Sequence, residues 1–236
     1  MPYLYWINDE SLILATQGLL EKAVAIKDQA EKNMNKNVLD PFSSLFQMGG
    51  FGLNYEEWRI SEITRQTQKS LQNHVGDFHQ NILGSVAGWE NKRTGNVIDL
   101  VNADRKIVAE VKNKHNTVKG SDLVGLYDTL GNAVNQKVSV YNGYTSYYVT
   151  IIPSKAVRIN KPFTPSDNKK GQKRAADENI RVIDGASFYE LVTGDLNALR
   201  DLFSVMPQVI ADITGKKFAD GEVGLLTSLF NGAYGE

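Results

Sequence analysis

The chain has 236 residues, of which 42% are hydrophobic and 22% are charged. These are ordinary values for a globular protein, and the length allows one generous domain or two small ones. The absence of cysteine excludes disulfide scaffolds, thiolate metal sites and cysteine nucleophiles, and three histidines leave little room for a histidine-rich metal cage. Taken alone, the formal net charge of −1 argues against a protein that binds a polyanion.

The sequence gives no sign of a secretion signal or a membrane anchor. Residues 1–6 are apolar but have no basic residues before them, and Asp9 and Glu10 follow almost at once. No run approaches the ~20 apolar residues of a membrane span. We therefore expect no membrane partner and a reducing, cytoplasmic location.

The first third of the chain predicts helices. Residues 11–33 have an amphipathic pattern that begins after Ser11. Residues 42–58 are rich in aromatic residues and glycine, which indicates a short helix and a loop. Residues 61–86 form the longest periodic segment, with an amide-rich polar face. Its apolar positions, which recur at steps of three and four, are Leu71, Val75, Phe78, Ile82 and Val86.

A change of period then predicts short strands. Residues 96–101 and 106–112, joined by a turn, are expected to form an antiparallel hairpin. Ser121 is expected to cap the helix that follows. Apolar, β-branched runs predict further strands at residues 147–152 and 180–183.

The rest of the chain predicts a basic insertion and more helices. Residues 154–179 are polar and basic and are expected to form a long surface loop. Helices are predicted at residues 186–193 and 195–213, the second interrupted at Pro207. Residues 214–236 give no clear pattern. This order of elements predicts an α/β fold with a mixed central sheet that is flanked by helices and carries a basic loop insertion.

Charged residues interrupt the two strands of the predicted hairpin. Asp99 lies in the first strand, and Glu110 and Lys112 lie on one face of the second. Burying charge is costly unless it is paired or binds a metal. Two carboxylates, with the Val111 carbonyl between the side chains of the second strand, suit Mg²⁺, and a lysine beside the metal suits phosphodiester hydrolysis. Surface charges on edge strands produce the same spacing by chance.

The hairpin resembles the core of the PD-(D/E)xK nucleases, with Ile98 in place of the proline of that motif. Five sequence blocks resemble, more specifically, the type II restriction endonucleases that cut GGNCC sites: IDLVN, AEVKNKHNTVKGSDL, YTSYYVTIIP, FTPSDNKKG and IDGASFYELVTG. The likeness extends from the first helix to about residue 210. It implies a restriction-endonuclease-like fold and Mg²⁺-dependent cleavage of both DNA strands at a short palindrome, leaving 5′-phosphates. Asp99 and Glu110 would then be metal ligands, and Lys112 the catalytic lysine.

Related nuclease cores often add an acid or an amide from the helix before the hairpin. Glu62, Asp77 and Gln80 are the candidates here, and Gln80 is preferred because it lies on the polar side near the end of the helix. A solvated helix residue is the alternative for Gln80. His74 and His79 lack zinc spacing and are expected to be surface or packing residues.

Basic and amide side chains in three segments are the predicted DNA contacts. A solvated helix face or loop is the alternative for each of them. The predicted contacts are Arg65, Gln66 and Lys69 on the long helix, Lys114, His115, Asn116 and Lys119 after the second hairpin strand, and Asp167, Asn168, Lys169, Lys170, Lys173 and Arg174 in the insertion.

We expect a single domain over residues 1–236, with a nuclease core at about 61–193, a helical region at 1–60 and helices at 194–236. A palindrome is read most simply by a two-fold symmetric homodimer. Two alternatives are a PD-(D/E)xK nuclease of DNA repair or junction resolution and an inactive DNA-binding module. The complete set of Asp99, Glu110 and Lys112 argues against the inactive module.

The net charge conceals a segregation of charge along the chain. Residues 105–119 carry a net charge of +4 and residues 154–181 a net charge of +5, so the remainder carries −10. Because DNA binding requires a local basic surface and not a basic protein, the overall charge of −1 no longer argues against it.

Overall fold

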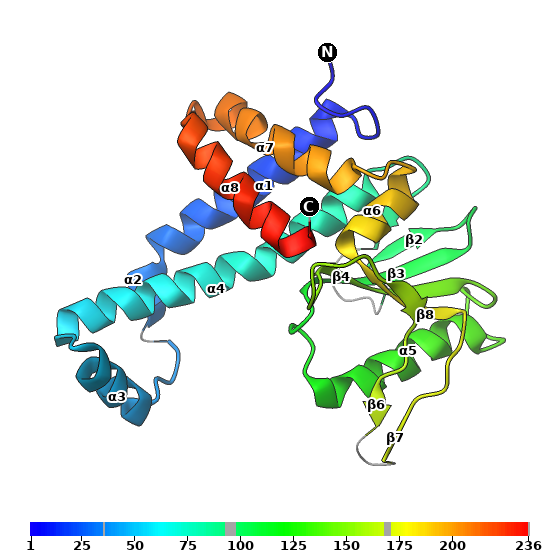
Figure 1. Ribbon diagram of the computed structural model, residues 1–236, viewed down its shortest axis with the longest axis horizontal. Helices are drawn as coiled ribbons and strands as arrows, with labels where there is room; N and C mark the ends of the chain where they lie inside the picture. Colours follow the sequence, from blue (N-terminus) through cyan, green and yellow to red (C-terminus); the bar gives the residue numbers. More distant parts are fainter. Residues whose placement is uncertain (35, 93–97, 168–170, 236) are drawn as a thin grey trace. The chain divides into compact units, whose positions relative to one another are not determined.

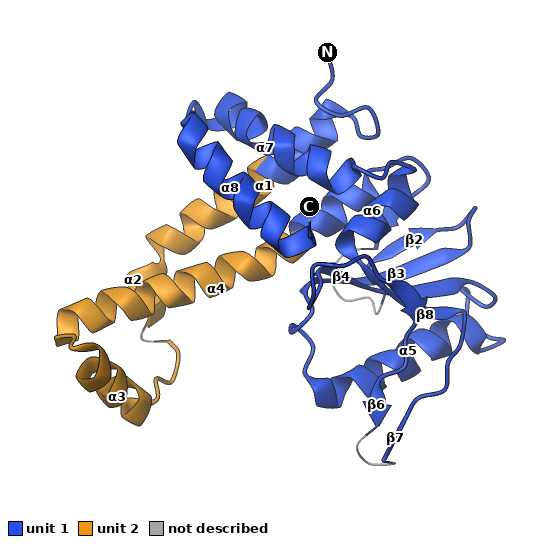
Figure 2. Ribbon diagram, viewed as in Figure 1, with its two compact units in different colours: residues 1–16, 78–236 blue, residues 17–77 orange. Residues whose placement is uncertain are grey.

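The computed structural model describes residues 1–34, 36–92, 98–167 and 171–235 (Figure 1). The chain divides into two compact units, one of residues 1–16 with 78–236 and one of residues 17–77 (Figure 2). The single domain expected from the sequence stays a prediction. Among the described residues, no helix is both long enough and apolar enough to cross a membrane.

The described part of the unit formed by residues 17–77 consists of helices. The predicted helix at 61–86 is confirmed but begins earlier, at Tyr55, while the pattern at 11–33 is divided into two helices. These helices are the second half of α1 (Asp9–Asp28), α2 (Ala30–Met34), α3 (Pro41–Phe51) and most of α4 (Tyr55–Gly84).

The start of α3 is fixed by its first residues. The Asp40 carboxylate accepts hydrogen bonds from the backbone N–H groups of Phe42 at 3.0 Å and Ser43 at 3.1 Å. Pro41 occupies the first helical position, where a backbone N–H would have no helical partner. The helix ends at Gly52, whose left-handed conformation (φ 67°) favours glycine.

A mixed sheet lies at the centre of the other unit, which confirms the predicted α/β fold. In the described residues it has six strands in the order β1-β2-β3-β4-β8-β5. The neighbours β3, β4 and β8 are parallel, and the remaining pairs are antiparallel. The strands are β1 (Glu90–Asn91), β2 (Leu100–Asn102), β3 (Ile107–Lys114), β4 (Thr145–Ile152), β5 (Asn160–Pro162) and β8 (Ile180–Asp184).

The predicted hairpin is formed by β2 and β3. Leu100 pairs with Ala109, and Asn102 pairs with Ile107. The described part of the first strand is shorter than the predicted one, since Ile98 and Asp99 precede it, and residues 96 and 97 lie outside the described residues.

Helices cover both faces of this sheet (Figure 1). Helix α5 (Leu123–Asn135) buries Leu130 and Val134 in a cluster with Val108 and Tyr148 on one face. On the other face, α6 (Gly185–Thr193) buries Phe188, whose ring meets those of Trp89 and Tyr147. The parallel crossover from β3 through α5 to β4 follows the usual βαβ arrangement.

Two expectations about helices are corrected, and a helix is found where none was assigned. Ser121 does not cap α5, because a 3-10 turn, η1 (Gly120–Asp122), comes first and the Ser121 hydroxyl bonds the Asp122 carboxylate. Helix α7 (Ala198–Thr214) continues through Pro207, since apolar residues buried on both sides of the proline hold it in place. The unassigned tail contains α8 (Asp220–Tyr234), which packs Phe230 on Phe203 at 4.8 Å between ring centroids.

The basic insertion is more ordered than the surface loop that was predicted. It supplies the edge strand β5, which pairs with β8, and a short hairpin of β6 (Ser166–Asp167) and β7 (Gln172–Lys173). Phe163 is buried against Tyr148 and Tyr127, so this segment also contributes to the core. Pro162 is tolerated because β5 lies at the edge of the sheet.

The first residue of α6 lies against β4 with no room for a side chain. A Cβ on Gly185 would be 2.3 Å from the backbone oxygen of Ile151. We expect Gly185→Ala to lower the free energy of unfolding by about 1–3 kcal/mol through overpacking. Gly224→Ala, in α8 with nothing within 4 Å, is the matched control and is expected to raise it by up to about 1 kcal/mol. Urea denaturation of both variants checks this, and equal effects would contradict it.

Candidate active site

The register of the hairpin places Asp99 across from the middle of β3. The Asp99 backbone N–H donates to the Ala109 carbonyl at 2.9 Å, and the Asp99 carboxylate accepts from the Val111 N–H at 2.7 Å. A carboxylate thus takes the place of a backbone acceptor just before β2 begins. Asp99 is therefore held beside Glu110, which lies between these two β3 residues.

Glu110 and Lys112 form an ion pair at the surface of this site. The Lys112 Nζ lies 2.5 Å from Glu110 Oε1, and the side chains are 30% and 12% exposed. The other carboxylate oxygen, Oε2 of Glu110, is buried and has no hydrogen-bond partner in the described part of the chain. Burying a carboxylate oxygen without a partner costs free energy. This oxygen could therefore serve as a ligand of a bound cation.

Burial raises the pKa of Glu110 from its usual 4.5 to about 7. Repulsion by the neighbouring Asp99 adds to this rise in the Glu110 pKa, whereas the Lys112 ammonium opposes it. Perturbed carboxyl groups of this kind are concentrated at functional sites.

Helix α4 reaches this site through Gln80. Its side-chain nitrogen lies 3.5 Å from the Val111 carbonyl, a long hydrogen bond. The other two candidates on this helix make different contacts: Glu62 is buried and bonds Arg65, while Asp77 bonds His74. Of the three, Gln80 alone has a contact with β3 in the described structure.

Tyr148 is a site residue that sequence reasoning missed. It is the β4 partner of Glu110 in the parallel register, and it is only 3% exposed. Its hydroxyl is buried without a hydrogen-bond partner among the described residues. Burial, and secondly the charge of Glu110, raises the Tyr148 pKa to about 12. The sequence could reveal this neighbour only if the β3–β4 register were known.

The donor atoms at this position fit a hard divalent cation. Asp99 and Glu110 offer carboxylate oxygens and Val111 a backbone oxygen, which are the ligand types that Mg²⁺ takes. Among the described residues, no group of three or more acidic, histidine or cysteine side chains converges on a metal position. A cation with only two carboxylates would keep several water ligands, as Mg²⁺ characteristically does.

Comparison with known proteins gives this arrangement its context. The sequence profile of the Eco47II restriction endonuclease family matches residues 4–215. The chain is 49% identical to the type II restriction enzyme Eco47II of Escherichia coli, an alignment that covers 92% of this chain and 90% of that enzyme. The chain belongs to the Eco47II restriction endonuclease family. It is also 30% identical to the type II restriction enzyme Sau96I of Staphylococcus aureus, over 98% of this chain and 89% of that enzyme.

Membership of this family confirms the resemblance seen in the sequence blocks. The chain is a type II restriction endonuclease, which acts on DNA. The two alternatives, a repair or junction nuclease and an inactive DNA-binding module, are therefore set aside.

One group of predicted DNA contacts of this restriction endonuclease lies at the end of β3. Lys114 is half-buried, and His115, Asn116 and Lys119 are exposed. A turn that includes the bond from the Thr117 N–H to the Lys114 carbonyl at 3.0 Å carries them away from the strand. These four side chains lie within seven residues of Lys112 in the sequence, and their DNA contacts stay predictions.

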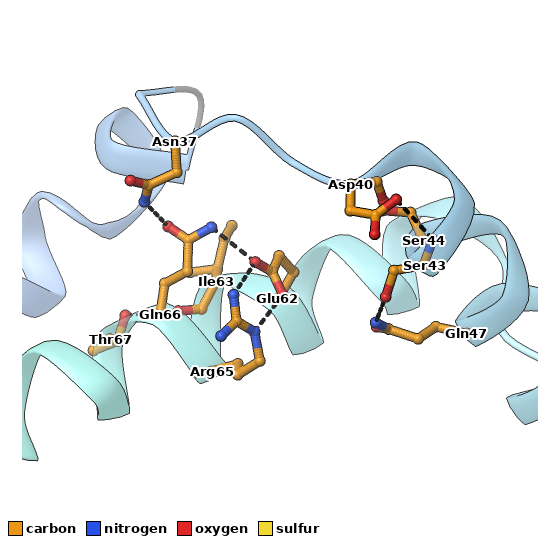
Figure 3. Close-up of polar contacts among 10 residues, drawn as sticks. All are labelled: Asn37, Asp40, Ser43, Ser44, Gln47, Glu62, Ile63, Arg65, Gln66 and Thr67. Carbon is orange, nitrogen blue, oxygen red and sulfur yellow. Dashed lines mark hydrogen bonds and ion pairs between the residues drawn. The ribbon is translucent and has the colours of Figure 1, made fainter. Parts of the chain in front are cut away.

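Two of the predicted contacts on α4 are engaged inside the unit of residues 17–77. Arg65 makes a forked pair with the buried Glu62 at 2.6 and 2.7 Å, and Gln66 donates to Glu62 at 2.9 Å (Figure 3). Gln66 also accepts from Asn37 at 2.9 Å. Lys69 is exposed. Arg65 would have to leave Glu62 to reach a base.

The predicted DNA contacts in the insertion likewise include both paired and exposed side chains. Arg174 bonds Asp128 at 2.6 Å and lies 3.8 Å from the buried Asp167. Lys173 is exposed. Asn168, Lys169 and Lys170 lie outside the described residues.

The histidines behave as packing and surface residues. His79 bonds the Tyr189 hydroxyl at 2.8 Å, and burial lowers the His79 pKa to about 4. Trp6, Trp58 and Trp89 are buried in the core.

The raised pKa of Glu110 predicts a pH dependence of stability in the metal-free protein. Between pH 4.5 and about 7 the folded state keeps a proton on Glu110 that the unfolded state has lost. The free energy of unfolding should therefore fall as the pH rises through this window. Glu110→Gln removes the ionisation and should be more stable than the wild type at pH 8 but not at pH 4. Thermal melting in EDTA checks this, with the exposed Glu10→Gln as control; parallel profiles for wild type and Glu110→Gln would contradict it.

Proposed function

We propose that this restriction endonuclease cuts both strands of DNA at GGNCC with a Mg²⁺-dependent site made by Asp99, Glu110 and Lys112. The observation that carries the proposal is the convergence of two carboxylates and a lysine on one hairpin, with a buried Glu110 oxygen that lacks a hydrogen-bond partner among the described residues. The specificity rests on the resemblance of five sequence blocks to GGNCC-cutting enzymes.

Asp99, Glu110 and the Val111 carbonyl would hold the cation. When bound, Mg²⁺ supplies positive charge that offsets the charge of the scissile phosphate and makes a water molecule more acidic. The Val111 N–H fixes the Asp99 carboxylate, so this ligand is oriented before any cation arrives. Gln80 holds the Val111 carbonyl from the side of α4, which makes it a positioning residue.

Lys112 would contribute a positive charge and a hydrogen-bond donor, which the two carboxylates cannot provide. Its ammonium lies beside Glu110 and is partly exposed, so it can donate to a phosphate oxygen or to the attacking water. Charge that builds up on the phosphate oxygens in the transition state is stabilised by such a fixed cation. Attack in line on the phosphorus leaves a 5′-phosphate and a 3′-hydroxyl.

The second copy of the site comes from a second copy of the chain. A palindrome presents one scissile phosphate in each strand, and a two-fold symmetric homodimer gives each phosphate its own site. The DNA backbone would be held by the lysines Lys69, Lys114, Lys119 and Lys173. Arg65, Gln66 and Arg174 already bond other side chains of the protein. They are candidates for contacts that form only at the recognition site.

Loss of a site residue should abolish cutting without loss of folding. Asp99→Asn keeps the size of the side chain but removes its charge, and Lys112→Met keeps an apolar stem without the ammonium. Each should lower the cutting rate by at least about 100-fold. Asp104→Asn, an exposed acid in the same hairpin turn, is the matched control and should cut normally. Undiminished cutting by either site variant would overturn the site.

Digestion of a mapped plasmid tests the specificity. With Mg²⁺, every fragment end should lie at a GGNCC site, and EDTA should prevent cutting because the carboxylates then lack their cation. A plasmid whose GGNCC sites have been mutated serves as the control and should stay intact. Ends at another sequence would refute the GGNCC assignment, and full activity in EDTA would refute the metal requirement.

A further inference from the structure

Helix α3 exposes its apolar side chains to solvent. Phe42, Leu45 and Phe46 are 72%, 64% and 74% exposed, and no residue of the helix is fully buried. The partly covered residues are Ser44, Gln47 and Met48, two of them polar. An ordinary amphipathic helix turns its apolar stripe toward the core, whereas α3 leaves most of its large apolar side chains exposed.

Three of the four exposed large apolar residues of α3 share one side of the helix; the fourth, Phe51, lies at the end of the helix on the other side. Phe42, Leu45, Phe46 and Gly49 follow each other at steps of three, one and three, which places them on a single stripe. We call this stripe the α3 face. Its glycine, with nothing within 4 Å of an added Cβ, allows a neighbour to approach the backbone closely.

The polar groups of α3 are satisfied within the helix and its cap. Figure 3 shows Ser44 bonded to the backbone carbonyl of Asp40 at 2.8 Å and Gln47 bonded to Ser43 at 2.9 Å. Asp40 in turn caps the helix. The α3 face itself therefore offers a partner apolar surface and almost nothing to hydrogen-bond.

The composition of the α3 face excludes DNA as its natural partner. Residues 41–55 contain no Lys, Arg, Asp or Glu. Contact with a phosphate backbone depends on cations, and none is present along this stretch. A face without charge can, however, meet an identical face without repulsion between like charges.

The area of the α3 face suits a protein interface. Its two phenylalanines, each nearly three-quarters exposed, present about 300 Å² together, to which Leu45 adds. A standard interface buries roughly 800 Å² per partner, of which about 57% is apolar. The α3 face thus supplies most of the apolar centre that a stable dimer needs.

We propose that the α3 face is the contact between two copies of this chain, each packing its α3 face against that of the other about a two-fold axis. The choice of a second copy as the partner rests on the proposed function, since cutting both strands of a palindrome requires two sites. An isologous contact needs a self-complementary patch, and an uncharged apolar stripe provides one.

A second exposed apolar pair gives the proposal a matched control. Leu225 and Leu229 on α8 are 72% and 71% exposed, similar to Leu45, and are four residues apart. They form a smaller stripe without aromatic residues, and Asp220 and Glu222 lie in the same helix. We expect α8 to stay free in the dimer.

Sedimentation velocity of the full chain at micromolar concentration tests the interface. The wild type should be a dimer, and Leu45→Glu and Phe46→Glu should raise the dimer dissociation constant by about 100-fold or more, because each buries a charge at the centre of the contact. Leu225→Glu should leave the dimer unchanged. Thermal melting should show that all variants fold, and Phe46→Ser replaces any glutamate variant that does not.

The outcomes separate this proposal from the proposed function. A monomeric wild type, a dimer that survives Phe46→Glu, or dissociation by Leu225→Glu would each overturn the α3 interface. Loss of DNA binding by Phe46→Glu with an intact dimer would identify the face as a DNA contact and would also overturn it. Plasmid cutting by the wild type is scored independently: a dimer that does not cut refutes the proposed function alone.

Discussion

The hydrogen bond from the Val111 N–H to the Asp99 carboxylate, at 2.7 Å, determines where the charges of this enzyme meet. It fixes an acid that directly precedes β2 against the strand that carries Glu110 and Lys112. Buried like charges repel each other, so the hairpin needs another source of stability. Buried apolar residues supply it, among them Leu100 and Val108, which are fully buried in β2 and β3. The apolar core thus holds together a site whose own electrostatics would separate it.

The formal charges of this site complement those of its proposed ligands. Two carboxylates and one ammonium sum to one negative charge, which a divalent cation would convert to one positive charge. A phosphodiester group carries one negative charge, so the loaded site and the scissile phosphate would neutralise each other. The buried Glu110 oxygen and the buried Tyr148 hydroxyl, neither with a hydrogen-bond partner among the described residues, lie on neighbouring strands of the same sheet. The free-energy cost of burying these two atoms is largely offset if a ligand provides a hydrogen bond or coordination.

The parts of the structure that the sequence predicted depend on local signals, and the parts it missed depend on long-range packing. Asp99, Glu110 and Lys112 could be identified because charges interrupt apolar strands within a short hairpin. Tyr148 could not, because its approach to Glu110 depends on the register of two parallel strands separated by α5. Helix α8 was missed because its three glycines weaken the helical pattern; packing of Phe230 on Phe203 compensates. The pair of Arg174 with Asp128 was equally invisible, since its partners are far apart in the sequence. The pair of Arg65 with Glu62, by contrast, has the i,i+3 spacing of a local helical contact.

The arginines of the basic segment 154–181 have consequences for how the enzyme would respond to salt. Arg158 pairs with Glu190, Arg174 with Asp128 and Arg181 with Glu178. By contrast, Lys155, Lys161 and Lys173 are exposed and make no ion pair in the part of the chain that the structure describes. Binding to DNA releases condensed counterions in proportion to the phosphates that are neutralised. A cation that must first leave a carboxylate gains little from this release. The dependence of DNA affinity on salt concentration would therefore be set by the lysines of this segment. It would be weaker than the total basic charge of the segment indicates.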